Sequence, residues 1–233
     1  EDLPLLVVGL VNADVQEQAF QFVVINNKAV KVPTDNVKAI IAGIDEEQLQ
    51  TRLLKAGVSY GDISPILRDI NDQAISPFRD ILDWPYNKNG PRLVPLTAIE
   101  QALRYIKTLF SFMEEDDDSL VAFFSAIWRS VKASYPELWG DQNKFMTKVN
   151  IAALNEYIVE RLKHAWEFGL VDVFDPDDVE KQVGRITALL PQEFWVAPWT
   201  IKIQDNANVR GLIKEDMSVL AENHRLRRSW FDN

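Results

Sequence analysis

The spacing of apolar residues predicts a chain built mainly from helices. From Thr97 onward, apolar residues recur at helical intervals in five long segments. The predicted helices cover residues 97–112, 119–134, 144–168, 177–190 and 206–222. A shorter helical segment is predicted within SYGDISPILRDIND (residues 59–72). Two prolines and two tryptophans in PQEFWVAPWT interrupt the pattern before the last helix.

The beginning of the chain has shorter and more varied elements. Residues 3–11 form a continuous apolar run of strand length. A helix is predicted over residues 15–25, where the apolar positions follow helical spacing and Asn12 or Asp14 can cap the first turn. Because a strand of the buried type comes first, we expect the chain to begin inside a domain.

Two further helices are predicted from their capping residues. Thr34 and Asp45 stand at the expected N-caps, and Gly43 and Gly57 at the expected ends. The proline-rich region 75–96 has a different pattern, with two short extended segments around Asn89-Gly90. It is predicted to be either a hairpin or a loop that folds over the neighbouring elements.

The acidic run EEDDDS (residues 114–119) separates two predicted helices. Asp and Ser in this run can cap the following helix, whose dipole favours negative charge at its beginning. Five consecutive carboxylates do not have the spacing of a calcium-binding loop, so we predict a solvated cap rather than a metal site.

Composition excludes several classes of site. The 233 residues carry a net charge of −10, so the whole surface does not attract nucleic acid or anionic membrane, although a local basic patch is still allowed. The absence of cysteine excludes disulfides, thiolate nucleophiles and cysteine–metal sites, and fits a reducing compartment. No apolar stretch reaches membrane-spanning length, and the acidic start is unlike a secretory leader. We expect a cytoplasmic protein without membrane contact.

Histidine chemistry is also limited by composition. His164 and His224 are the only histidines, and neither belongs to a metal-binding motif. His164 stands beside a tryptophan with no nucleophile near it in the sequence, so we interpret it as a packing or capping residue. No complete catalytic constellation and no phosphate loop is present, and we assign no catalytic or metal-ligating residue.

The segment FVVINNKAVKVPTDN (residues 22–36) is the first candidate ligand site. The amides of Asn26 and Asn27, the ammonium groups of Lys28 and Lys31, and the free backbone N–H groups of a helix starting at Thr34 can together bind a phosphate. The alternative is structural, with one helix C-cap followed directly by the next N-cap.

The end of the last predicted helix is the second candidate. The tail HRLRRSW contains Arg225, Arg227, Arg228 and Trp230, a combination suited to phosphate and single-strand contacts. The alternative is a basic helix end, where cations interact favourably with the helix dipole.

The first hundred residues resemble the DGQHR-domain family, which includes DndB-like proteins associated with bacterial DNA modification and phage defence. The resemblance covers residues 1–105 and rests on a phrase made here by Phe22, Ile25, Asn26, Lys28 and Val32. Later stretches that look like the family's continuation are RLL (52–54), ISPFRDIL (75–82) and NGPRLVPLTAIEQAL (89–103). The DGQHR motif itself does not occur in the chain.

A more distant similarity connects the same region with the ParB/sulfiredoxin-like fold. In that family a glutamate, an asparagine and an arginine cradle a nucleotide's phosphates. Asn26 matches the asparagine, whereas Ile25 and Ala29 occupy the glutamate and arginine positions. This similarity implies a mostly α (α+β) chain: residues 1–112 as the C-terminal part of a DGQHR/ParB-like domain with a helical continuation, and residues 113–233 as a helical domain.

The resemblance implies an accessory or regulatory protein of a DNA-modification or restriction-type defence system that binds nucleotide or DNA phosphates. One alternative is a nucleotide-hydrolysing enzyme, using a nucleotide with Mg²⁺, whose catalytic motif lies upstream of Glu1. Another is a helical protein–protein scaffold for modification enzymes, which the acidic charge favours over a direct DNA binder. DNA, other DNA-modification proteins and a second copy of the chain are the candidate partners.

Overall fold

The computed structural model describes residues 11–14, 17–18, 20–22, 24–25, 64–83, 93–140, 145–197 and 206–228. The chain divides into two compact units, Glu1–Pro65 and Ile66–Asn233. In the first unit, the described residues between 17 and 25 are helical, as predicted. Asp14 is the cap, because its Oδ1 accepts a hydrogen bond from the backbone N–H of Glu17 at 2.7 Å.

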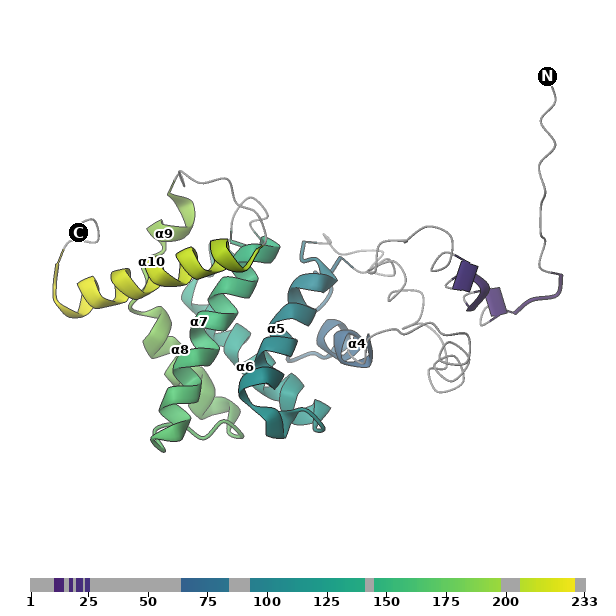
Figure 1. The fold of residues 1–233 in the computed structure, drawn as a ribbon, viewed down its shortest axis with the longest axis horizontal. Coiled ribbons are helices and arrows are strands. Elements are labelled where there is room, and N and C mark those ends of the chain that lie inside the picture. Colours follow the sequence, from purple (N-terminus) through teal and green to yellow (C-terminus); the bar gives the residue numbers. More distant parts are fainter. Residues whose placement is uncertain are drawn as a thin grey trace, which may run out of the picture. The chain divides into compact units, whose positions relative to one another are not determined.

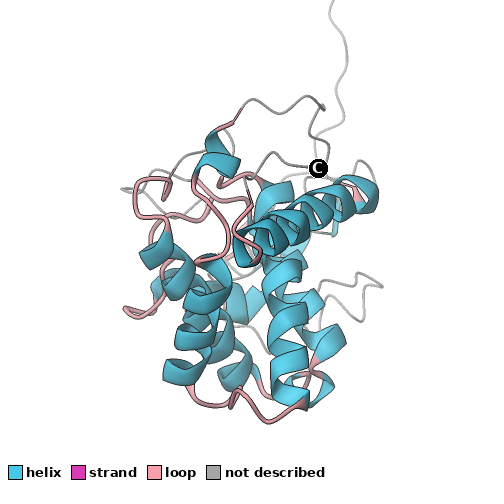
Figure 2. Cartoon of the chain, turned by 90° about the vertical axis from the view of Figure 1, so that its left-hand side faces the viewer, coloured by secondary structure: helices cyan, strands magenta, loops and turns pink. Residues whose placement is uncertain are grey.

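The described part of the chain is 68% helical and contains no strand. Figure 1 shows its elements, and Figure 2 shows the helices from the side. They are α4 (Ser64–Asp72), α5 (Leu96–Leu109), η1 (Ser111–Met113), α6 (Asp117–Ser134), α7 (Lys148–Glu167), α8 (Pro176–Thr187), α9 (Glu193–Val196) and α10 (Ala207–Arg225). The helical prediction is confirmed for these segments, with element ends shifted by a few residues. The strand predicted over residues 3–11 and the helices predicted after Thr34 and Asp45 lie outside the described residues.

Local capping explains where several helices begin. Asp116 caps α6, as expected from the acidic run: its carboxylate accepts hydrogen bonds from the backbone N–H and the hydroxyl of Ser119, at 3.0 and 2.6 Å. Asp175 caps α8 just before Pro176, and Asn206 caps α10. Each cap satisfies a backbone donor that the helix itself leaves without a partner.

Aromatic side chains fill the core between α6 and the turns that precede α5. The ring of Phe78 lies 5.5 Å from that of Phe124 and 5.2 Å from that of Trp128, and all three side chains are buried. A buried amide links three helices: Asn155 on α7 accepts a hydrogen bond from the indole of Trp128 on α6 and donates one to the carbonyl of Ala102 on α5. This bond pair fixes the relative position of α5, α6 and α7.

The region 75–96 is only partly described. Leu82 and Val94 form an isolated β-bridge, supported by a 2.7 Å hydrogen bond from the N–H of Asp83 to the carbonyl of Val94. The bridge is parallel, unlike the pairing in a hairpin, so the loop-over alternative fits the described residues better. The predicted turn at Asn89-Gly90 lies outside them.

The α/β domain expected from the resemblance is not seen in the described residues, and it stays a prediction. The predicted boundary after residue 112 falls within η1, inside the second compact unit, where α5 packs against α7. None of the described helices combines the length and the apolar character needed to cross a membrane.

Candidate functional site

The first predicted site lies outside the described residues. This holds for Asn26, Asn27, Lys28, Lys31 and Thr34. The helix that leads toward them is described as far as Ile25, whose side chain is exposed. The phosphate-binding hypothesis for this segment therefore stays a prediction.

The second predicted site is described except for Trp230. Arg225, Arg227 and Arg228 are all exposed at the end of α10. The chain leaves the helix through a turn in which Arg227 has a left-handed φ of 57° and the N–H of Arg228 donates to the carbonyl of Asn223. Glycine is the usual residue at this position, so an arginine here carries a small conformational cost.

A fourth arginine lies close to this basic end. The side chain of Arg161 on α7 is half-buried, and burial together with the nearby Arg225 guanidinium lowers its pKa against the opposing effect of Tyr157 and Glu160. The Arg161 guanidinium itself donates to the Tyr157 carbonyl and to the hydroxyl of Ser218. The exposed arginines at the end of α10 suit an anion, although cations at a helix C-terminus are also stabilised by the helix dipole.

His164 does not have the packing role that was one of the two predicted from its surroundings. Its side chain is exposed on the last turn of α7, with Nδ1 3.6 Å from a carboxylate oxygen of Glu167. In the described part of the chain, no three His, Asp or Glu side chains are grouped as metal ligands would be.

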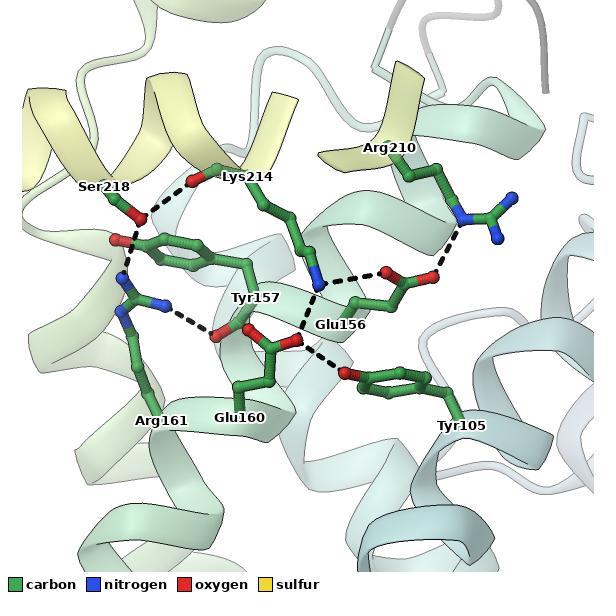
Figure 3. Close-up of polar contacts among 8 residues, drawn as sticks. All are labelled: Tyr105, Glu156, Tyr157, Glu160, Arg161, Arg210, Lys214 and Ser218. Carbon is green, nitrogen blue, oxygen red and sulfur yellow. Dashed lines mark hydrogen bonds and ion pairs between the residues drawn. The ribbon is translucent and has the colours of Figure 1, made fainter. Parts of the chain in front are cut away.

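A polar cluster that the sequence pattern did not predict lies between α5, α7 and α10 (Figure 3). Lys214 of α10 places its Nζ 2.6 Å from a carboxylate oxygen of Glu160 and 3.3 Å from one of Glu156. Arg210, one turn earlier, bonds Glu156 at 2.8 Å. The hydroxyl of Tyr105 on α5 donates to Glu160 at 2.5 Å.

Charge and burial act against each other in this cluster. Burial on its own would raise the pKa of Glu160, but the hydrogen bonds from Lys214 and Tyr105 outweigh it and hold that pKa below its ordinary value. Burial likewise acts to lower the pKa of Lys214, and the two glutamates more than reverse this effect. Both groups are therefore ionised at neutral pH and stabilise each other.

A second contact joins α7 and α10 in the same view. The guanidinium carbon of Arg161 lies 3.2 Å from the centre of the Tyr157 ring, and the guanidinium donates to the hydroxyl of Ser218 at 3.2 Å. The Tyr157 hydroxyl donates to the carbonyl of Met217. Because its carboxylates, cations and hydroxyls bond one another, the cluster fastens α10 to the bundle and does not present open ligand-binding groups.

An apolar surface gathers where η1 meets the turn between α7 and α8. The ring of Phe112 lies 5.3 Å from that of Trp166 and 5.2 Å from that of Phe174. Phe168 and Leu170, in the same turn as Phe174, are also exposed. We call the residues Phe112, Trp166, Phe168, Leu170 and Phe174 the apolar end surface.

Comparisons with known proteins give no identification: no protein-family model matches the sequence, no curated protein is significantly similar to it, and no solved structure matches the fold.

Both features missed at the sequence level have a signal in the sequence. Glu156 and Glu160 are four residues apart, as are Arg210 and Lys214, and such opposite pairs on two helices can form ion pairs across them. Which helices meet could not be predicted from this spacing. For the apolar end surface, the signal is the group of closely spaced large apolar residues Phe168, Leu170 and Phe174 around the end of the predicted helix 144–168.

Proposed function

We propose that this chain is a helical protein–protein interaction module. The observation that supports this function best is the apolar end surface, where three large apolar side chains of one turn are mostly exposed: Phe168 at 78%, Leu170 at 68% and Phe174 at 60%. Large apolar side chains that are exposed close together along an ordered segment are typical of binding surfaces. The resemblance to DGQHR-domain proteins makes DNA-modification enzymes the proposed partners, and an accessory or regulatory role in such a system the proposed context.

The polar cluster of Figure 3 is consistent with an interaction module rather than an enzyme. Its charged groups are paired with one another, and the pKa directions of Glu160 and Lys214 move away from neutrality, where an acid or base catalyst works best. Nucleotide hydrolysis would instead depend on the segment around Asn26 and on a motif upstream of Glu1. A hydrolysis assay with Mg²⁺ on a chain extended upstream tests that alternative.

A second candidate function is phosphate or DNA binding at the end of α10. The specific observation in its favour is that Arg225, Arg227 and Arg228 are all exposed together at the end of this helix. Binding of duplex or single-stranded DNA should then weaken steeply with salt, and Arg227→Gln with Arg228→Gln should reduce the salt dependence. Salt-independent or absent DNA binding rejects this candidate.

The interaction function is tested by purifying the tagged chain from its native source, crosslinking it and identifying the bound proteins. The variant Phe168→Ser/Leu170→Ser removes apolar area from the surface, whereas the control Leu212→Ser/Val219→Ser makes the same kind of change at exposed positions on α10. We expect a partner that the wild type and the α10 variant capture and the surface variant loses. Equal capture by all three proteins, or no captured protein, contradicts the proposed function.

A further inference from the structure

The apolar end surface is held in a defined conformation. After α7, the N–H of Leu170 donates to the carbonyl of Ala165 at 2.8 Å, and the N–H of Gly169 donates to that of Trp166 at 2.9 Å. Gly169 has a φ of 66°, which a glycine adopts without steric cost. This is the Schellman arrangement at a helix end, and it fixes the direction in which the chain leaves α7.

The rest of the turn is anchored by alternating burial. Val171 and Val173 are buried, whereas Leu170 and Phe174 on either side of them are exposed. Asp172 accepts a hydrogen bond from the N–H of Phe174 at 2.9 Å, and its own N–H donates to Asp178 of α8 at 2.8 Å. The exposed side chains are therefore presented by a backbone that is already ordered, which reduces the entropy lost on binding.

Carboxylates flank the residues of this surface in the sequence. Exposed acidic residues directly follow η1, stand at the end of α7 and precede or begin α8, where Asp178 is partly exposed: Glu114, Glu115, Asp116, Asp117, Asp118, Glu167, Asp172, Asp175 and Asp177. Asp69 on α4 adds to this charge. Burial and the nearby carboxylates of Asp117 and Asp118 raise its pKa, against the effect of Arg68.

The two lysines near these carboxylates, Lys107 and Lys163, are too few to neutralise their charge. Lys107 is bonded to the carbonyl of Glu114 and to Asp117. Lys163 lies 4.3 Å from the centre of the Trp166 ring and 3.5 Å from Glu167. Two lysines thus face a much larger number of acidic groups, and the surface is apolar at its centre with a negative rim.

We propose that the apolar end surface binds a basic amphipathic segment of a partner protein, in which leucine or aromatic anchors are flanked by lysine or arginine. This inference rests on the proposed interaction function and deepens it by naming the partner's chemistry. The anchors contact Phe112, Phe168 and Phe174, and the flanking cations approach the rim, where complementary charge speeds association and selects the partner. A second copy of the chain is disfavoured, because a symmetric contact would bring the two acidic rims together. An anionic membrane is disfavoured for the same reason.

The test uses three short labelled peptides and fluorescence anisotropy. One is an amphipathic helix of leucine and lysine, the second replaces lysine by glutamate in the same pattern, and the third keeps the lysines but replaces leucine by glycine and serine. We expect the wild-type chain to bind the leucine–lysine peptide at least about tenfold more tightly than either control, because apolar contact and charge must both be satisfied.

Two pairs of variants locate the binding. Phe168→Ser/Leu170→Ser should weaken the leucine–lysine peptide about tenfold, whereas Leu212→Ser/Val219→Ser should leave it unchanged. Glu114→Gln/Glu115→Gln should weaken it about threefold at low salt and reduce its salt dependence, whereas Glu215→Gln/Glu222→Gln, with the same charge change on α10, should have a smaller effect. Thermal unfolding of each variant verifies that the exposed substitutions leave the fold intact.

Several results overturn the proposal. Equal affinity for the leucine–glutamate peptide removes the basic partner, and equal affinity for the glycine–serine–lysine peptide removes the apolar anchor. Self-association that depends on Phe168 and Leu170 assigns the surface to a second copy instead. If the peptides do not discriminate but native-source purification still captures a protein through Phe168 and Leu170, the partner chemistry is wrong and the interaction function stands. If no protein is captured, the function itself fails.

Discussion

Replacing Lys214 by methionine tests whether the ion-pair cluster holds α10 on the bundle. Lys214 bonds Glu160 at 2.6 Å and contacts Glu156 at 3.3 Å, and its side chain is largely buried. Methionine keeps most of the apolar stem but removes the charge. Glu156 then has Arg210 as its remaining partner among these residues, and Glu160 has Tyr105.

The size of the effect follows from the burial of the pair. Exposed ion pairs contribute about 0.2–1 kcal/mol, and hydrogen bonds to buried charged groups contribute about 1.5–3 kcal/mol. Lys214 and Glu160 are between these limits, with side chains 22% and 35% exposed. We therefore expect Lys214→Met to lower the free energy of unfolding by about 2 kcal/mol, or the Tm by roughly 4–8 °C for a unit of this size.

Urea unfolding followed by circular dichroism measures this difference, with Lys181→Met on the exposed face of α8 as the matched control. The control should change stability by less than about 0.5 kcal/mol. A double-mutant cycle with Glu160→Gln should give a coupling energy of about 1 kcal/mol. If Lys214→Met costs no more than Lys181→Met, the cluster does not hold α10, and the apolar contacts of Ile213 and Met217 must do so.

Three further predictions follow from the described contacts. The pH dependence of stability should be much reduced in Lys214→Met. The contribution of Glu160, whose pKa is lowered, is present above the ordinary carboxyl pKa and is lost as the pH falls to the folded-state value, whereas that of Lys214, whose pKa is raised, is lost only when the pH rises above the ordinary lysine value. The ion pair therefore contributes most between about pH 5 and 10, and equal pH profiles for the two proteins would contradict this. Asp116→Ala should lower the urea midpoint of unfolding through loss of the α6 cap, with Asp118→Ala as a milder control, and an equal effect of both would show that the cap bonds contribute little. Asn155→Leu should cost about 1–3 kcal/mol, because it leaves the buried indole N–H of Trp128 and the Ala102 carbonyl without this partner, and an unchanged unfolding midpoint would show that the amide bridge is dispensable.

The helices were the most predictable part of the fold. Their apolar spacing and capping residues are local signals, and Asp116 caps α6 as its place in the acidic run indicated. The bounds were less predictable: the segment expected to extend to residue 112 as one helix ends at Leu109, and the chain continues as the separate turn η1. Such ends depend on packing, here on the buried Phe110 and Met113, which local periodicity does not encode.

The polar cluster and the apolar end surface depend on which helices meet. Tyr105 and Glu160 are 55 residues apart, and Lys214 is 54 residues beyond Glu160, so no local pattern announces their contact. The proximity of Phe112 to Phe174 is likewise a tertiary result. The candidate residues chosen from the sequence, in contrast, were those with conspicuous local chemistry, and of these the structure describes the three arginines at the end of α10.

The proposed interaction function is tested most directly by quantitative affinity purification from the native source with three proteins in parallel: the wild type, Phe168→Ser/Leu170→Ser and Leu212→Ser/Val219→Ser. Isotope-labelled mass spectrometry measures how much of each bound protein is recovered. We expect a partner that the wild type and the α10 variant recover equally and that is depleted about tenfold or more with the surface variant. Equal recovery of every bound protein by all three would contradict the assignment of the apolar end surface as the binding surface.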